Sequence, residues 1–174
     1  MARLLMLDLF SGLGGASAVM RDRPDRWDVI RVELDEKFEA DHRDVRTYQH
    51  DGRPVDLLWA SPPCTEFSRE SMPWCRTGAT PDLGLAWAAR VLVERIHPRW
   101  WVLENVRGAV PWLRPALGRP CVIGPLRLWG RFPAFIPGPA HFYKERISGK
   151  RPDLRSQIPR HISAALADAC ERDR

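Results

Sequence analysis

A short apolar run that ends at two prolines restricts the fold of this chain more than any other feature. The run covers residues 55–60, and Pro62, Pro63 and Cys64 come shortly after it. Because proline cannot donate to a sheet ladder, the pattern predicts a buried strand that ends at this point. Ligands of open α/β sheets bind at the carboxyl ends of strands, so Cys64 is a candidate nucleophile. A buried, unreactive thiol is the alternative, because free cysteine is among the most buried residue types.

A glycine-rich turn follows the first apolar run of the chain. Residues 4–10 predict a strand with Asp8 near its end, and the sequence SGLGGASAVM then predicts a turn and a helix. Glycines at positions 12, 14 and 15 would let backbone N–H groups approach a ligand closely at a helix N-terminus. The turn therefore predicts a nucleoside cofactor. Ser17 stands where a dinucleotide fingerprint has its third glycine, which disfavours NAD.

An acid closes the second predicted strand, which covers residues 27–34. Glu33 lies near the end of this strand, where an acidic side chain typically binds the ribose hydroxyls of a nucleoside. A solvated acid at a strand end is the alternative. We expect a short helix over residues 37–43 and a brief third strand over residues 44–48, from which Asp44 would face the same pocket.

A second candidate catalytic side chain follows another buried strand. Residues 66–80 predict a mobile loop long enough to close over a substrate. Apolar residues at helical spacing predict a crossover helix over residues 82–96, and residues 100–103 then predict a parallel strand that ends at Glu104. A carboxylic acid near a thiolate could protonate a ring nitrogen. An ion-paired or helix-capping glutamate is the alternative.

Prolines interrupt the pattern after residue 109. We expect irregular structure there, with two short antiparallel strands near residues 121–122 and 126–129 and a basic loop over residues 142–155. A closing helix is predicted over residues 160–172. A length of 174 residues favours one α/β domain, in which residues 1–110 carry the motifs and residues 111–174 form an irregular basic segment with the closing helix.

Charge is unevenly distributed along the chain. Residues 1–86 hold 11 Lys/Arg and 15 Asp/Glu, whereas residues 87–174 hold 16 Lys/Arg and 7 Asp/Glu. A basic half beside a chemical site favours a polyanionic partner such as nucleic acid. The four cysteines lack the spacing of zinc ligands, and no apolar run is long enough to cross a bilayer. We therefore expect a soluble cytoplasmic protein with reduced thiols and no metal.

Together these residues resemble the cytosine-C5 DNA methyltransferase family. DLFSGLGG is similar to its cofactor motif, SPPCTEFS to its Pro-Cys motif and LENV to its Glu-Asn-Val motif, in the family's order. RSQIP, before the last predicted helix, is similar to its closing motif. The resemblance implies a Rossmann-like, S-adenosylmethionine-dependent methyltransferase fold, with a mostly parallel sheet and helices on both of its faces.

The resemblance also implies roles for individual residues. The cofactor S-adenosylmethionine would be held by Asp8, Phe10, Ser11, Gly12, Leu13, Gly14, Gly15, Glu33, Leu34, Asp44, Val45, Ser61 and Pro62. Cys64 would add to C6 of cytosine while Glu104 holds or protonates N3, with Pro63 and Asn105 completing the catalytic group. The cytosine would be flipped out of a duplex or supplied single-stranded. Contacts to nucleic acid are expected from Ser68, Arg69, Arg76, Arg107, Arg127, Arg131 and Arg146.

Two features depart from the family. First, the family's Gln-x-Arg-x-Arg motif is missing after Glu-Asn-Val, and Arg127, Arg131 or Arg146 could substitute for its arginines. Second, about fifty residues separate Val106 from Arg155, which is too few for a separate target-recognition domain. We therefore expect a compact enzyme, of the kind carried by a phage or mobile element, that methylates DNA in a relaxed or short cytosine context. Tight binding would call for a second copy or an accessory specificity protein. Methylation of tRNA, or a non-catalytic subunit that binds S-adenosylmethionine and nucleic acid, are the alternatives.

Overall fold

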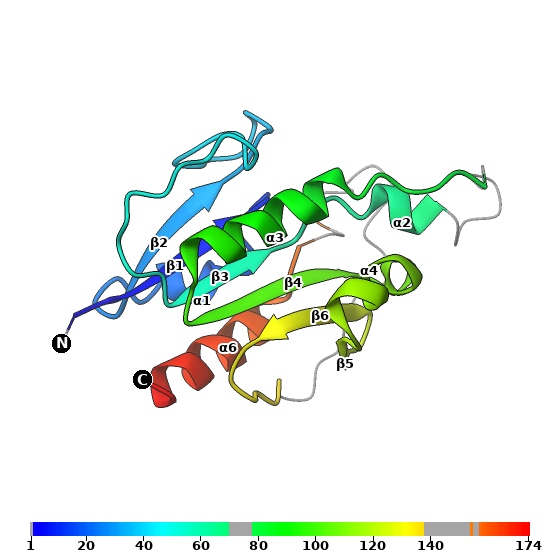
Figure 1. Cartoon of the computed structure of the whole chain (residues 1–174). Helices are drawn as coiled ribbons and strands as arrows, with labels where there is room; N and C mark the ends of the chain where they lie inside the picture. Colours follow the sequence, from blue (N-terminus) through cyan, green and yellow to red (C-terminus); the bar gives the residue numbers. More distant parts are fainter. Residues whose placement is uncertain (1, 70–77, 138–153, 155–156) are drawn as a thin grey trace.

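A six-stranded sheet in the order β2-β1-β3-β4-β6-β5 organises the computed structural model (Figure 1). Its strands are β1 (Leu4–Leu9), β2 (Trp27–Val32), β3 (Leu57–Ala60), β4 (Trp100–Val106), β5 (Cys121–Ile123) and β6 (Leu126–Arg131). The first four run parallel, whereas β6 pairs antiparallel with both β4 and β5. The predicted mostly parallel sheet and antiparallel strand pair are thus confirmed. The structure describes residues 2–69, 78–137, 154 and 157–174.

Helices cover both faces of this sheet (Figure 1). α3 (Gly84–Ile96) packs on one face, and α1 (Ala18–Arg21) and α6 (Arg160–Arg172) pack on the other. Successive side chains of β1 point to opposite faces of the sheet: Leu5 packs in the hydrophobic cluster that contains α3, and Leu4 packs in the cluster that contains α6. A strand buried on both faces is a nearly continuous apolar run, which is why these strands are visible in the sequence. The helices predicted over residues 82–96 and 160–172 are confirmed.

Two further helices lie where the sequence predicted irregular structure. α2 (Thr65–Arg69) occupies the start of the predicted loop, and α4 (Val110–Leu117) follows the short 3-10 helix η2 (Arg107–Ala109). Pro111 lies in the first turn of α4, where the missing N–H is not needed, so it starts the helix instead of preventing it. The remainder of the predicted loop, residues 70–77, and most of the predicted basic loop, residues 142–153 and 155, lie outside the described residues.

The helix predicted over residues 37–43 and the strand predicted over residues 44–48 were both wrong. The carbonyl of Arg31 accepts hydrogen bonds from the N–H groups of Asp41 and His42, which holds this segment beside the end of β2. Asp44 then begins a turn, because its side chain accepts from the N–H of Arg46 and its carbonyl accepts from that of Thr47. Contacts with β2 and the Asp44 turn therefore replace the regular elements.

The order of the strands creates a switch point between β1 and β3. The chain leaves β1 for β2 on one side and returns to β3 on the other side. The N–H of Ser61 donates to the carbonyl of Leu9 at 3.3 Å, so the carboxyl ends of β1 and β3 lie together. In sheets of this kind, ligands bind in the crevice outside such a point. The glycine turn after β1 and the Pro-Pro-Cys turn after β3 both begin at this edge.

Candidate active site

The turn after β1 has a backbone shape that favours glycine. Gly12 and Gly14 have φ angles of 48° and 73°, and Phe10 adopts a φ of 57° despite its side chain. A non-glycine residue with positive φ is strained, and such strain persists where the surroundings impose it. Gly15 is restricted differently, because a Cβ there would lie 2.6 Å from the carbonyl oxygen of Ile158. The segment of the predicted closing motif thus packs directly on the glycine turn.

The glycine turn has the features of a site for a polar ligand. The Oγ atom of Ser11 is buried and has no hydrogen-bond partner among the described residues. A Cβ built on Gly12 would meet no atom within 4 Å, so this side of the turn is open. A buried hydroxyl without a partner costs free energy unless a ligand or water satisfies it. These residues fit a cofactor with polar groups.

Asp8 lies beneath the turn as a buried acid. Its side chain is 1% exposed, and Ser17 Oγ donates to its Oδ2 at 2.6 Å. Burial raises the pKa of Asp8 to about 6, although the Ser17 hydrogen bond and the charges of Arg31 and Arg21 oppose the rise. Ser17 is the residue that replaces the third glycine of the dinucleotide fingerprint. Its role as the partner of Asp8 was not predicted, because only the fold brings the two side chains together.

Glu33 reaches from the end of β2 to the glycine turn. Its Oε2 accepts from the N–H of Gly12 at 2.8 Å, and its Oε1 accepts from the N–H of Asp35 at 3.0 Å. The acid predicted for the ribose hydroxyls therefore lies beside the predicted cofactor turn. Leu34, the next residue, is 62% exposed. Its apolar side chain is thus open to contact with a ligand.

The Asp44-Val45 pair divides between the surface and the core. Hydrogen bonds from Arg46 hold the pKa of the Asp44 carboxyl below its usual range, and the two side chains form an ion pair at 2.7 Å. Val45 is buried in the core cluster that also contains Val32 of β2. Its side chain therefore anchors the segment against the sheet. Asp44 and Val45 both stay candidate cofactor residues, although the Asp44 carboxylate is paired with Arg46 in this structure.

Asn105 joins the ends of β3 and β4. Its Nδ2 donates to the carbonyl of Pro62 at 3.1 Å, while its Oδ1 accepts from the N–H of Val106 at 2.9 Å. Asn105 is 1% exposed, and its hydrogen bond to Pro62 is buried. The amide therefore fixes the Pro-Pro-Cys turn to the neighbouring strand. This link between two separate motifs could not be seen in the sequence.

Cys64 and Glu104 come from neighbouring parallel strands. In the register of β3 and β4, Ala60 lies beside Leu103, and Glu104 is the next residue along β4. Glu104 is 8% exposed, and Cys64 is half-buried with a free thiol. The carbonyl of Cys64 accepts a hydrogen bond from the N–H of Ser68 in the first turn of α2. Pro63, the residue before Cys64, is exposed. Both candidate catalytic groups thus belong to one edge of the sheet.

The predicted nucleic-acid contacts do not all share this edge. Arg107 is exposed directly after β4, and Arg127 lies opposite Asn105 in the register of β4 and β6. Arg69 forms an ion pair with Glu66 within α2, one residue after Ser68. Arg131 lies opposite Trp101, at the other end of β4, so it cannot replace a motif at the Cys64 edge. Arg76 and Arg146 lie outside the described residues.

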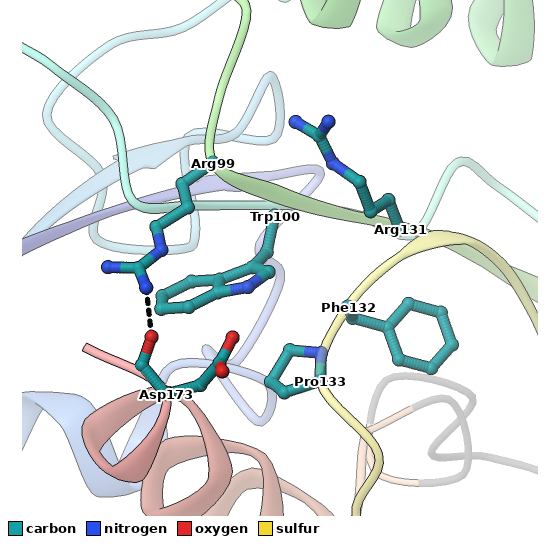
Figure 2. A pocket seen from close by; sticks show the side chains of 6 residues that line it. All are labelled: Arg99, Trp100, Arg131, Phe132, Pro133 and Asp173. Atoms are coloured by element: carbon teal, nitrogen blue, oxygen red, sulfur yellow. Dashed lines mark hydrogen bonds between the residues drawn. The ribbon is translucent and has the colours of Figure 1, made fainter.

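A surface hollow of about 430 Å³ lies at that opposite end of the sheet (Figure 2). Arg99 stacks 4.3 Å above the ring of Trp100 and donates to the backbone carbonyl of Asp173, which closes the hollow on one side. The hollow is therefore separate from the switch point. Among the described residues, no group of three or more His, Cys, Asp or Glu side chains could hold a metal ion. No helix in this part of the chain is long and apolar enough to span a membrane.

The fold and these motifs define a class of protein and then a family. A parallel sheet with a glycine turn after β1, an acid after β2 and a cysteine after β3 is a Rossmann-like α/β arrangement of the methyltransferase type. The model of the C-5 cytosine-specific DNA methylase family matches residues 4–111. The chain therefore belongs to the C-5 cytosine-specific DNA methylase family. No curated protein matched the chain.

Several solved structures are similar to this chain. A protein described as a prophage-encoded DNA modification methyltransferase of E. coli is 21% identical, with a TM-score of 0.47, over 73% of this chain and 45% of its own. The Entamoeba histolytica methyltransferase EhMeth is 16% identical, with a TM-score of 0.49, over 78% and 55%. A DNMT2 mutant of Spodoptera frugiperda is 16% identical, with a TM-score of 0.41, over 74% and 50%. The chain spans about half the length of these structures.

Proposed function

We propose that this protein transfers a methyl group from S-adenosylmethionine to C5 of cytosine in DNA, through a covalent adduct of Cys64. The observation that carries the proposal is the position of Cys64 after the carboxyl end of β3 and of Glu104 near the carboxyl end of the adjacent parallel strand β4, in a chain of the C-5 cytosine-specific DNA methylase family. The carboxyl end of β3 also borders the switch point between β1 and β3, where ligands of such sheets bind.

Cys64 and Glu104 would act on two different atoms of the cytosine ring. The Cys64 thiolate adds to C6, and a proton held by Glu104 at N3 stabilises the electrons that move into the ring. C5 thereby becomes nucleophilic. C5 would take the methyl group as the bond from that group to the sulfonium sulfur of the cofactor breaks, which leaves a neutral thioether. C5 would then lose its proton to a base, the C6–S bond would break, and the thiolate of Cys64 would be released. Asn105 holds the turn that carries the thiol through its hydrogen bond to the carbonyl of Pro62.

The glycine turn and Glu33 would hold the cofactor. S-adenosylmethionine supplies a methyl group on a positively charged sulfur. The Glu33 carboxylate would accept from ribose hydroxyls in place of the Gly12 N–H that it contacts at 2.8 Å. The buried Ser11 hydroxyl, which has no partner among the described residues, would bond to a polar group of the cofactor. Asp44 would approach the adenine from the segment beside β2.

DNA would be held mainly through its phosphates. Residues 105–144 contain five arginines and one lysine but no Asp or Glu. Within this stretch, Arg107 and Arg114 are exposed and have no ion pair to any described acid. Phosphate contacts position a duplex without reading its sequence. We therefore propose that one catalytic domain methylates a relaxed or short cytosine context.

The test is methyl transfer from labelled S-adenosylmethionine to mixed DNA, followed by bisulfite sequencing. We expect C5 methylation by the wild-type protein and none by Cys64→Ser, because a hydroxyl is a much weaker nucleophile at neutral pH. The matched control is Cys121→Ser, since Cys121 is an exposed free thiol on β5 and should be dispensable.

Covalent trapping tests the Cys64 adduct independently of the methyl-transfer assay. DNA with 5-fluorocytosine should form a stable adduct with the wild-type protein and with Cys121→Ser, because fluorine at C5 cannot leave as a proton does. Methylation of cytosine by Cys64→Ser at the wild-type rate would refute the covalent mechanism. Methylation of tRNA in preference to DNA would refute the proposal that DNA is the substrate. A strict methylation motif of four or more base pairs would refute the proposal of a relaxed or short cytosine context.

A further inference from the structure

Two arginines from different elements contact the carbonyls of the glycine turn. Arg31, on β2, donates from Nη2 to the carbonyl of Gly12 at 2.7 Å. Arg21, at the end of α1, donates from Nη2 to the carbonyl of Gly14 at 3.3 Å. The turn is thus held from the sheet on one side and from the helix on the other. Neither arginine belongs to the predicted site.

The glycine turn needs such partners because regular structure does not hold it. Its positive φ angles are incompatible with a helix, and α1 begins only at Ala18. The turn carbonyls therefore lie outside the helical hydrogen-bond ladder, and a backbone carbonyl without a partner is unfavourable when water is excluded. Guanidinium groups supply charge-assisted hydrogen bonds, which are stronger than neutral ones.

The burial of Arg31 indicates that its position has a specific role. Arg31 is 7% exposed, and its Nε atom is buried without a hydrogen-bond partner among the described residues. Burying a guanidinium costs free energy that only specific interactions repay. Two interactions offset this cost: Arg31 donates to the Gly12 carbonyl, and its charge favours the ionised form of Asp8. A residue placed only to stabilise the fold would be better apolar at this depth.

Gly14 makes room for both guanidinium groups. A Cβ at this position would lie 2.9 Å from Nη2 of Arg21 and 3.2 Å from Cζ of Arg31. A distance of 2.9 Å is shorter than real Cβ contacts, so a larger residue at this position would shift the Arg21 guanidinium, which is the end of a flexible side chain. The glycine therefore serves the arginine contacts in addition to its φ angle of 73°.

We propose that Arg21 and Arg31 are positioning residues that clamp the glycine turn in its cofactor-binding shape through the carbonyls of Gly14 and Gly12. A turn that is already fixed in the free protein loses less conformational entropy when a ligand binds, so the clamp raises affinity without touching the ligand. The inference rests on the proposed function for the identity of the cofactor, but the clamp itself is a property of the free protein.

Hydrogen exchange on the free protein tests the clamp directly. The N–H of Gly12 bonds to Glu33 and the N–H of Gly14 bonds to the carbonyl of Ser11, so both amides report on the shape of the turn. We expect Arg21→Gln to accelerate exchange at these two amides by roughly tenfold through local opening. Arg21 is exposed, so its replacement should leave the melting temperature unchanged.

The matched control is Arg23→Gln, two residues further along the chain. Arg23 bonds to Asp168 and Glu171 of α6 and does not contact the turn. This variant should lower the melting temperature while leaving the exchange of the turn amides at the wild-type rate. A conservative Arg31→Lys variant completes the set, since lysine keeps the charge but loses the planar guanidinium group.

Binding of S-adenosylhomocysteine, measured by calorimetry, gives the second readout. Arg21→Gln should weaken binding about tenfold, and Arg23→Gln should bind as the wild type does. Unchanged amide exchange in both Arg21→Gln and Arg31→Lys would overturn the clamp, as would equal acceleration in Arg23→Gln. A wild-type protein that does not bind S-adenosylhomocysteine would instead overturn the proposed cofactor, while the exchange experiment would still decide the clamp.

Discussion

At the residue scale, Asp8 illustrates how a side chain near a ligand site can oppose stability. Burial raises the pKa of Asp8 to about 6, so the folded protein binds this proton more tightly than the unfolded chain, which releases it near pH 4. The wild-type protein should therefore lose roughly 2 kcal/mol of stability, relative to Asp8→Asn, between about pH 4 and pH 7. Urea unfolding of both proteins across this range measures the difference. A constant difference between Asp8→Asn and the wild type across this range would contradict the burial of the Asp8 charge.

At the element scale, one acid holds the closing helix against the start of the sheet. Glu171 of α6 accepts from Arg23 at 2.8 Å, Arg26 at 2.6 Å and Trp27 Nε1 at 2.9 Å. Burial alone would raise the pKa of Glu171, but these hydrogen bonds outweigh it and lower the pKa. The stabilisation is therefore present at neutral pH and is lost as the pH falls through the folded pKa. Glu171→Gln should lower the free energy of unfolding by about 1–2 kcal/mol at pH 7 and by much less near pH 3. Asp168→Asn, at a half-exposed carboxylate, should cost less than about 0.5 kcal/mol, and an equal loss from both variants would refute the specific role of Glu171.

At the scale of the whole molecule, the uneven charge distribution predicts how DNA binds. The acid-free stretch over residues 105–144 begins directly after Glu104, and its first two arginines, Arg107 and Arg114, lie in η2 and α4, which follow β4. Binding of a labelled duplex should weaken steeply between about 50 and 200 mM salt, because phosphate contacts release counterions. Arg114→Ala, on α4, should reduce the slope of log K against log salt by about 0.9. Arg95→Ala removes an exposed arginine from α3 and should leave the slope unchanged. Equal slopes for all three proteins would show that α4 does not contact DNA.

The elements that the sequence predicted best are those whose own residues specify them. β3 is apolar throughout and β1 is apolar except for Asp8, because both faces of each strand are buried, and α3 shows helical spacing because only one of its faces is buried. The same logic located Asp8, Glu33, Cys64 and Glu104 near the ends of strands, where polar residues replace the apolar run. It failed for α4, because its prolines resemble helix breakers until the position of Pro111 in the first turn is known.

The sequence by itself determined which apolar runs become the parallel strands, and the tertiary structure decided which ends of these strands meet. The strand order placed β3 between β1 and β4, and only that order joins Asn105 to Pro62 and separates Arg131 from the cysteine edge. It also decided that residues 37–48 follow β2 as turns. Periodicity and turn chemistry act over a few neighbouring residues, whereas these contacts join positions far apart in the chain, so their energies depend on packing that no local pattern contains.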